Sequence, residues 1–197
     1  HSEKVFNMKR LLLILILTSS FQSWTKADDI TDFEIEGMTI GDSLLDYMSK
    51  SEIKKAEENS TLYPDNEYIV IFSNHSSAKY DMIEITYSNK NKDYLIDALV
   101  GKVLYPNNYE QCTIDKKEIV NEFKKTFGDS TIDEHVQPHH VDNKSTVDAS
   151  DFYITSGGMV RVSCTDYSKK MLTENGWKDS MKISLSNEEF VKYLSNL

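Results

Sequence analysis

The sequence lacks an apolar run long enough to cross a membrane. Its longest run, Leu11–Leu17, contains seven residues, whereas a transmembrane helix needs about 20. The basic pair Lys9 and Arg10 precedes this run, and the small residue Ala27 ends the segment that follows it, which is the pattern of a secretory signal peptide. We therefore expect residues 1–27 to comprise upstream residues and a cleavable signal. A short buried helix and an uncleaved anchor are the alternatives.

Arginine is almost absent, and acidic residues outnumber basic ones. The chain has 22 Lys and Arg against 32 Asp and Glu, so that its net charge is −10. Residues 1–27 carry four basic side chains and one acidic one, so residues 28–197 have a net charge of −13, with Arg161 their only arginine. Such a surface repels nucleic-acid phosphates and anionic lipid headgroups. We expect no nucleic-acid partner, and we interpret residues 28–197 as a single domain whose acidity favours solubility.

Cysteine is scarce as well, with Cys112 and Cys164 as the only two. They do not form a Cys-x-x-Cys pair, so redox catalysis is not expected, and no cysteine directly follows Leu17, so no lipoprotein anchor is expected after cleavage. In an exported chain such a pair favours a structural disulfide. Closing a loop of about 52 residues would add about 4 kcal/mol to the free energy of unfolding. Two free buried thiols are the alternative.

The string Gly41-Asp42-Ser43-Leu44 resembles the nucleophile block of the GDSL (SGNH) esterases. A serine nucleophile needs a general base and oxyanion donors, which these enzymes supply from a Gly-x-Asn-Asp block and a C-terminal Asp-x-x-His. The chain contains no Asn-Asp dipeptide, and no aspartate stands three residues before any of its downstream histidines. We therefore interpret Ser43 as a helix cap, with a divergent serine esterase as an alternative function.

Histidines and carboxylates are concentrated in residues 133–142, which contain His135, His139 and His140. Imidazole and carboxylate ligands suit zinc, copper or nickel, and a metal site at these histidines is a second alternative. Pro138, however, prevents the helix that would align His135 with His139. The surrounding segment, 129–149, shows no sustained periodicity, and we interpret it as a long solvated loop. No cofactor is expected elsewhere.

Short apolar or alternating runs are separated by polar segments. They predict six strands, at residues 67–74, 80–87, 94–105, 152–155, 159–165 and 182–185, with Gly101 as a bulge. Capping residues and apolar stripes predict helices that begin at Asp42 or Ser43, Asp115, Ser168 and Ser186. This order predicts an α+β fold, in which a mainly antiparallel sheet packs against helices, and it favours two similar helix-then-three-strand halves.

Stretches from both ends of the chain resemble one family. Residues 27–30, 33–38 and 40–47, and later residues 162–167 and 182–186, are similar to small exported proteins of marine Pelagibacter-like alphaproteobacteria. The resemblance implies a Gram-negative periplasmic protein and transfers no catalytic residue. The order of elements alone also resembles the tandem modules of β-lactamase inhibitor proteins, which gives an expectation of fold only.

These observations together favour a binding protein. We expect an exported domain, periplasmic or secreted, that is non-enzymatic and acts as a binding or accessory module for a protein or small ligand. Two surfaces are open to this role: a sheet face enriched in some of the 11 tyrosines, and the 129–149 loop. The sequence does not distinguish between them.

Overall fold

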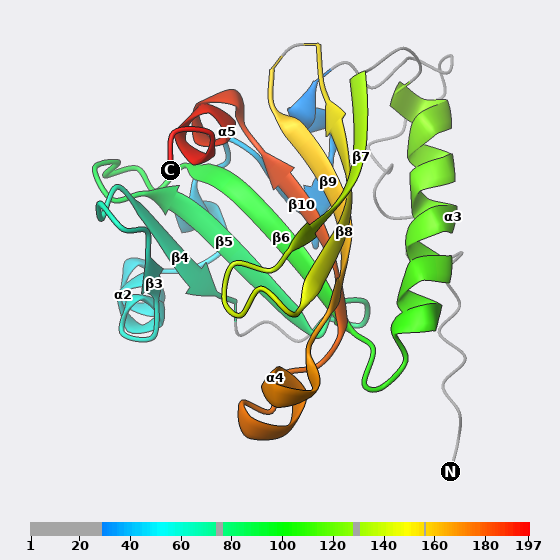
Figure 1. Ribbon diagram of the computed structural model, residues 1–197. Helices are drawn as coiled ribbons and strands as arrows, with labels where there is room; N and C mark the ends of the chain where they lie inside the picture. Colours follow the sequence, from blue (N-terminus) through cyan, green and yellow to red (C-terminus); the bar gives the residue numbers. More distant parts are fainter. Residues whose placement is uncertain (1–28, 74–76, 128–130, 156) are drawn as a thin grey trace.

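A computed structural model describes residues 29–73, 77–127, 131–155 and 157–197 (Figure 1). The signal expected in residues 1–27 lies outside the described residues. Within the described part, no helix is long and apolar enough to cross a membrane.

Eight strands form one antiparallel sheet, in the order β3-β4-β5-β6-β10-β9-β8-β7. Their bounds are Thr61–Leu62, Tyr68–Phe72, Met82–Ser88, Ile96–Leu104, Thr131–Pro138, Thr146–Tyr153, Met159–Asp166 and Ser180–Ser186 for β3 to β10. The expected α+β class and antiparallel sheet are confirmed. The order describes two successive four-stranded meanders whose last strands, β6 and β10, pair at the centre. Each half thus has four strands, one more than the sequence predicted.

The helices are distributed around this sheet. They are α2 (Lys50–Glu57), α3 (Tyr109–Phe127), α4 (Lys169–Glu174) and α5 (Glu188–Leu194), with 3₁₀ turns at Ile30–Asp32 and Leu44–Asp46 and a small hairpin of β1 (Glu34–Ile35) and β2 (Met38–Thr39). α3 lies against β9 and β10, and α2 lies against β4. α4 and α5 lie near opposite ends of the sheet (Figure 1).

Alternate residues of each strand contribute to one apolar core. On β5, Ile83, Ile85 and Tyr87 are at most 2% exposed, while the residues between them turn to the other face of the sheet. α3 covers this core with an apolar stripe in which the rings of Phe123 and Phe127 lie 5.6 Å apart. Residues of both halves belong to this single cluster.

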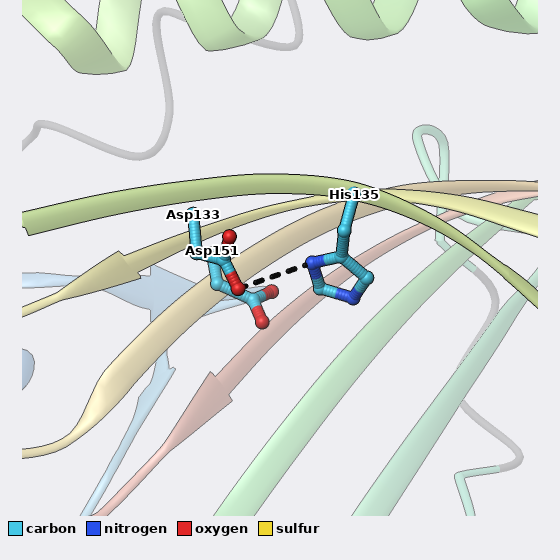
Figure 2. Close-up of side chains that lie close together, drawn as sticks. All are labelled: Asp133, His135 and Asp151. Carbon is cyan, nitrogen blue, oxygen red and sulfur yellow. Dashed lines mark ion pairs between the residues drawn. The ribbon is translucent and has the colours of Figure 1, made fainter.

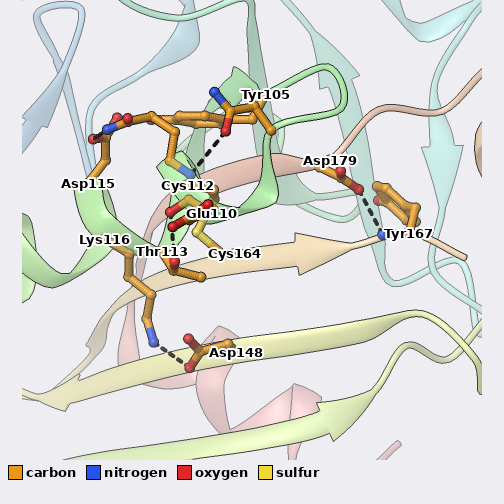
Figure 3. The surroundings of a disulfide bond; sticks show 12 residues. Tyr105, Glu110, Cys112, Thr113, Asp115, Lys116, Asp148, Cys164, Tyr167 and Asp179 are labelled. Atoms are coloured by element: carbon orange, nitrogen blue, oxygen red, sulfur yellow. Dashed lines mark hydrogen bonds and ion pairs between the residues drawn. A yellow bond between two sulfur atoms is a disulfide. The ribbon is translucent and has the colours of Figure 1, made fainter.

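The predicted disulfide between Cys112 and Cys164 is confirmed (Figure 3). It joins α3 to β9 across a Cα–Cα distance of 6.1 Å, and both residues are fully buried. Beside it, the Nζ atom of Lys116 on α3 lies 2.5 Å from a carboxylate oxygen of Asp148 on β8. A covalent bond and an ion pair therefore fix the helix to the core side of the second half.

The interpretation of residues 129–149 as a long loop is wrong. β7 and the first half of β8 lie in this range and pair in regular antiparallel register, with His135 opposite Ala149. β7 is the outermost strand of the sheet, and Val136 on it is 70% exposed. Backbone pairing with β8, rather than an apolar face, holds this strand in place. No alternation of apolar and polar residues therefore appeared in the sequence.

The predicted first helix is also wrong in extent. Ser43 caps only the 3₁₀ turn Leu44–Asp46, and α2 begins separately at a capping box formed by Ser49 and Glu52. The Ser49 amide donates to the Glu52 carboxylate at 2.7 Å. This Ser-x-x-Glu pattern was visible in the sequence and could have located the start of α2.

The helix starts predicted at Asp115 and Ser186 and the bulge predicted at Gly101 are also wrong. Asp115 is buried inside α3, where it accepts a hydrogen bond of 2.6 Å from the Tyr105 hydroxyl. Asn187, rather than Ser186, caps α5 through the Phe190 amide at 2.7 Å. Gly101 pairs regularly on β6, and the register shift lies between Thr86 and Tyr87 of β5. By contrast, Ser168 caps α4 as predicted.

Candidate functional site

The face of the large sheet opposite the core is the floor of a groove. Its floor is built from residues that alternate with core residues, among them Glu84 on β5, Val100 on β6 and Ser184 on β10. Phe190 of α5 and Pro138 at the end of β7 also line it. The groove encloses about 500 Å³, which is within the range of small-molecule sites. α5 and the β7–β8 connection lie on the same side of the sheet (Figure 1).

The wall formed by α5 is aromatic. The rings of Tyr68 on β4 and Phe190 on α5 lie 4.9 Å apart, and Tyr63 packs edge-on against Phe190 at 5.5 Å. Burial, followed by the negative charge of Asp97, raises the pKa of Tyr68 to about 12. Tyr68 itself is buried, and the rings of Tyr63 and Phe190 that pack on it line this end of the groove.

The opposite wall is the turn between β7 and β8, which is attached to the start of α4. The Ser168 hydroxyl donates to the Asp142 carboxylate at 2.5 Å, and the Ser168 amide donates to the Ser145 hydroxyl at 2.9 Å. Asp142 also accepts from the Ser145 amide at 2.9 Å. These hydrogen bonds lower the pKa of Asp142. The turn thus has a fixed position relative to the sheet, although it lies at the tip of a hairpin.

Two ion pairs lie on the floor of the groove. Lys182 on β10 places its Nζ 3.3 Å from a carboxylate oxygen of Glu84 on β5. Arg161 on β9 holds both oxygens of Asp151 on β8, at 2.5 and 2.6 Å. Asp151 is 1% exposed, so the guanidinium compensates for a buried carboxylate. This bidentate contact gives Arg161 a structural role.

The histidines proposed as metal ligands fall into two places. His135 lies on β7 with Asp133 and with Asp151 of β8, and one ligand atom from each lies within 4.8 Å of the others (Figure 2). Its Nδ1 is 3.4 Å from an Asp133 oxygen. His139 and His140 stack on each other in the β7–β8 turn, with ring centroids 4.5 Å apart. Among the described residues, they do not join the cluster around His135.

Ser43, the candidate nucleophile, is engaged in local structure. Its hydroxyl donates to the Asp93 carbonyl at 2.7 Å and accepts from the Leu45 amide at 3.3 Å. Across residues 29–73, 77–127, 131–155 and 157–197, no hydrogen bond joins Ser43 to a histidine. The prediction that Ser43 is a cap is therefore confirmed.

Sequence reasoning missed the residues that shape the groove. Lys182 stands directly opposite Lys102 of β6, and this neighbourhood depends on pairing between strands about 80 residues apart in the chain. Trp177, in the connection between α4 and β10, packs 5.0 Å from Tyr167. No spacing in the sequence signals such contacts. Only the alternation of Lys182 with the apolar residues Met181 and Ile183 indicates that it faces away from the core.

Comparison with known proteins finds no matching protein-family model, no matching curated protein and no matching solved structure.

Proposed function

We propose that this protein is an exported, non-enzymatic binding domain that takes its ligand in the groove on the sheet. The observation that carries the proposal is the groove itself, whose opposite walls, at Phe190 and Pro138, come from separate parts of the chain. The 129–149 segment considered from the sequence supplies one wall of this site. The strand tyrosines do not form its floor, because Tyr80, Tyr87 and Tyr105 belong to the buried core. A pre-formed site of this kind binds without a large rearrangement.

The proposed location follows from the disulfide and the expected signal peptide. A buried disulfide such as Cys112–Cys164 persists in oxidising compartments and is rare in the cytosol. The family resemblance supports the periplasm as that compartment. The role of Ser43 as a cap supports a binding function over hydrolysis.

The proposal is tested by filling the groove. We choose Ser184→Trp, because Ser184 lies on the floor in the middle of the sheet, and Ser51→Trp on the exposed surface of α2 as the matched control. Thermal-shift measurements with a panel of amino acids, sugars and organic acids should find ligands that raise the melting temperature of the wild-type protein. Ser184→Trp should abolish these shifts, while Ser51→Trp should retain them.

Two results would contradict the proposal. One is a ligand shift that persists unchanged in Ser184→Trp. The other is labelling of the wild-type protein by a fluorophosphonate probe that disappears in Ser43→Ala, since this would identify a serine hydrolase.

The cluster of Asp133, His135 and Asp151 supports metal binding as a second candidate function. Arg161 counts against it, because its guanidinium already holds both oxygens of Asp151. If a metal binds here, zinc or copper should raise the melting temperature in the wild-type protein and in His140→Ala but not in His135→Ala. Equal behaviour of all three proteins would reject this site.

A further inference from the structure

Two lysines stand directly opposite each other at the centre of the sheet. Lys102 of β6 and Lys182 of β10 are paired in register, and both turn to the groove side. Like charges placed directly across an antiparallel pair are unfavourable. Lys182 is compensated by Glu84 at 3.3 Å, but Lys102 forms no ion pair with any described residue. One positive charge is therefore left without a carboxylate in an acidic protein.

The space around Lys102 is a pocket that continues the groove toward α4. It encloses about 500 Å³ and shares Lys182, His139, His140 and Tyr167 with the groove. Its other cation is Lys178, which is exposed just after Trp177. Within the described part of the chain, no aspartate or glutamate lines this pocket, although acidic residues outnumber basic ones, 32 to 22. Among the described residues, this recess thus brings three lysines together without a carboxylate.

Carboxylates that flank the pocket, including Asp81, which accepts from the Leu104 amide at 2.8 Å, are committed to other partners. Asp142, in the β7–β8 turn, accepts from Ser168 at 2.5 Å. Asp179, just before β10, accepts from the Tyr167 amide at 2.9 Å and is 4% exposed (Figure 3). Glu84 pairs with Lys182. These contacts leave Lys102, Lys178 and the histidines as the charged and titratable groups that line the pocket without a carboxylate partner among the described residues.

The pocket also has an aromatic wall. Trp177 lies edge-to-face with Tyr167 at 5.0 Å and with His139 at 6.1 Å. The apolar side chains of Met82 and Leu104 complete the lining. A flat apolar group fits against such a wall, since aromatic rings contribute both contact area and defined stacking geometry.

We propose that this pocket binds a small organic anion that carries a flat apolar group, with its carboxylate or phosphate placed between Lys102 and Lys182. An anion in this position relieves the repulsion between the two lysines and supplies the ion pair that Lys102 lacks. The aromatic wall takes the apolar part of the ligand. This inference rests on the proposed function and specifies the class of ligand that the groove takes.

The electrostatic surroundings of His139 agree with this assignment. Burial lowers its pKa most, the charges of His140, Lys182 and Lys102 lower it further, and Asp142 opposes them. Burial and Lys182 likewise lower the pKa of Lys102, against the opposing charge of Glu84. A bound anion opposes the effect of these positive charges, so that binding of a carboxylate near pH 6 should be accompanied by net uptake of protons. Titration calorimetry in buffers of different ionisation enthalpy measures this uptake.

The ligand class is tested with phenylacetate, phenyl phosphate, acetate and the neutral analogue phenylacetamide. The full chain carries Trp24→Phe, so that Trp177 is the only remaining tryptophan and its fluorescence reports directly on the pocket. Phenylacetate or phenyl phosphate should bind, and the comparison of the two identifies the preferred anionic group. Acetate and phenylacetamide should each bind at least ten times more weakly, because each lacks one of the two features.

Variants then assign the binding to the two lysines. Lys102→Met and Lys182→Met should each weaken binding of the preferred probe at least tenfold. Lys55→Met, at an exposed position of α2, should leave it unchanged. Circular dichroism and melting temperatures verify that each variant is folded. Binding should also weaken as salt is added, since the contact is ionic.

The outcomes separate this inference from the proposed function. If neither aromatic anion binds, while neutral compounds bind in the groove and are lost in Ser184→Trp, the ligand class is wrong and the binding function stands. If nothing binds in either assay, both proposals fail. Equal affinity for phenylacetate and phenylacetamide, or unchanged affinity in Lys102→Met, would also overturn the assignment to an anion.

Discussion

The two faces of the large sheet are made by the same strands but have opposite chemistry. The face toward α3 is apolar and is fixed covalently by Cys112–Cys164. The face toward the groove carries charged and hydroxyl side chains, including Glu84 and Lys182 joined at 3.3 Å. Because successive residues of a strand alternate between faces, a central strand such as β5 contributes to both.

The difference shows how this fold separates stability from binding. On the covered face, burial and the disulfide determine the stability of the protein. The groove face contains an arrangement that costs stability, the direct opposition of Lys102 and Lys182. Binding sites commonly keep such unfavourable arrangements, because they become favourable when the ligand is bound. Substitutions on the two faces should therefore change the free energy of unfolding in opposite directions. A substitution on the covered face should lower it, and removal of Lys102 should raise it.

Removal of the disulfide should have the largest effect. The double variant Cys112→Ala/Cys164→Ala releases a constraint across 52 residues and should lower the free energy of unfolding by about 4 kcal/mol. Urea denaturation measures this loss. Wherever the variant remains folded, its affinity for the anionic probe should be unchanged. A loss below about 1 kcal/mol would show that the covered face does not depend on this bond.

A smaller effect is expected at Gly101 on the covered face of β6. A Cβ atom there would lie 2.3 Å from the ring of Tyr80, which is 7% exposed and cannot move freely. Gly101→Ala should therefore destabilise the protein by about 1–3 kcal/mol. The double variant Gly101→Ala/Tyr80→Ala removes the clash, so the alanine at position 101 should cost less in that background. Equal costs in both backgrounds would contradict the contact.

The two faces were also unequally predictable from the sequence. Apolar alternation on strands such as Met159–Asp166 identified the covered face, since burial imposes that pattern. The strand β7 was missed because its side chains are polar on both faces and only backbone pairing with β8 defines it. The site was missed for a related reason, because the contact of Lys102 with Lys182 exists only after distant strands pair in register.

On the groove face, a substitution should raise stability. Lys102→Met removes the like charge opposite Lys182 and places an apolar side chain on a partly buried position, so the free energy of unfolding should rise by about 0.2–1 kcal/mol. The same variant should lose affinity for the anionic probe. Lys55→Met, on exposed α2, provides the control for the loss of one positive charge from the whole protein. If Lys102→Met instead unfolds at a lower free energy than the wild-type protein, substitutions on both faces would lower stability, and the expected contrast between the faces would be absent.

The smallest effect concerns His139, at the end of the groove. Its folded-state pKa lies below the ordinary value of about 6.5, so the unfolded chain binds the proton more readily. The stability that neutral His139 contributes is complete above pH 6.5, and it is lost as the pH falls through the folded-state pKa. His139→Gln should therefore flatten the decline of stability between pH 7 and pH 5.

The change should be about 0.5 kcal/mol or less, since water screens this partly buried ring. Urea denaturation of both proteins across this pH range gives the difference between the curves, which cancels the contributions of other titrating groups.

NMR titration of the His139 ring, assigned by its absence in His139→Gln, should give an apparent pKa below 6.5, and this pKa should rise when the anionic probe is bound. A value above 6.5 without ligand would mean that burial and the neighbouring positive charges do not outweigh Asp142 at this end of the groove. The charge contrast between the two faces would then be confined to Lys102 and Lys182.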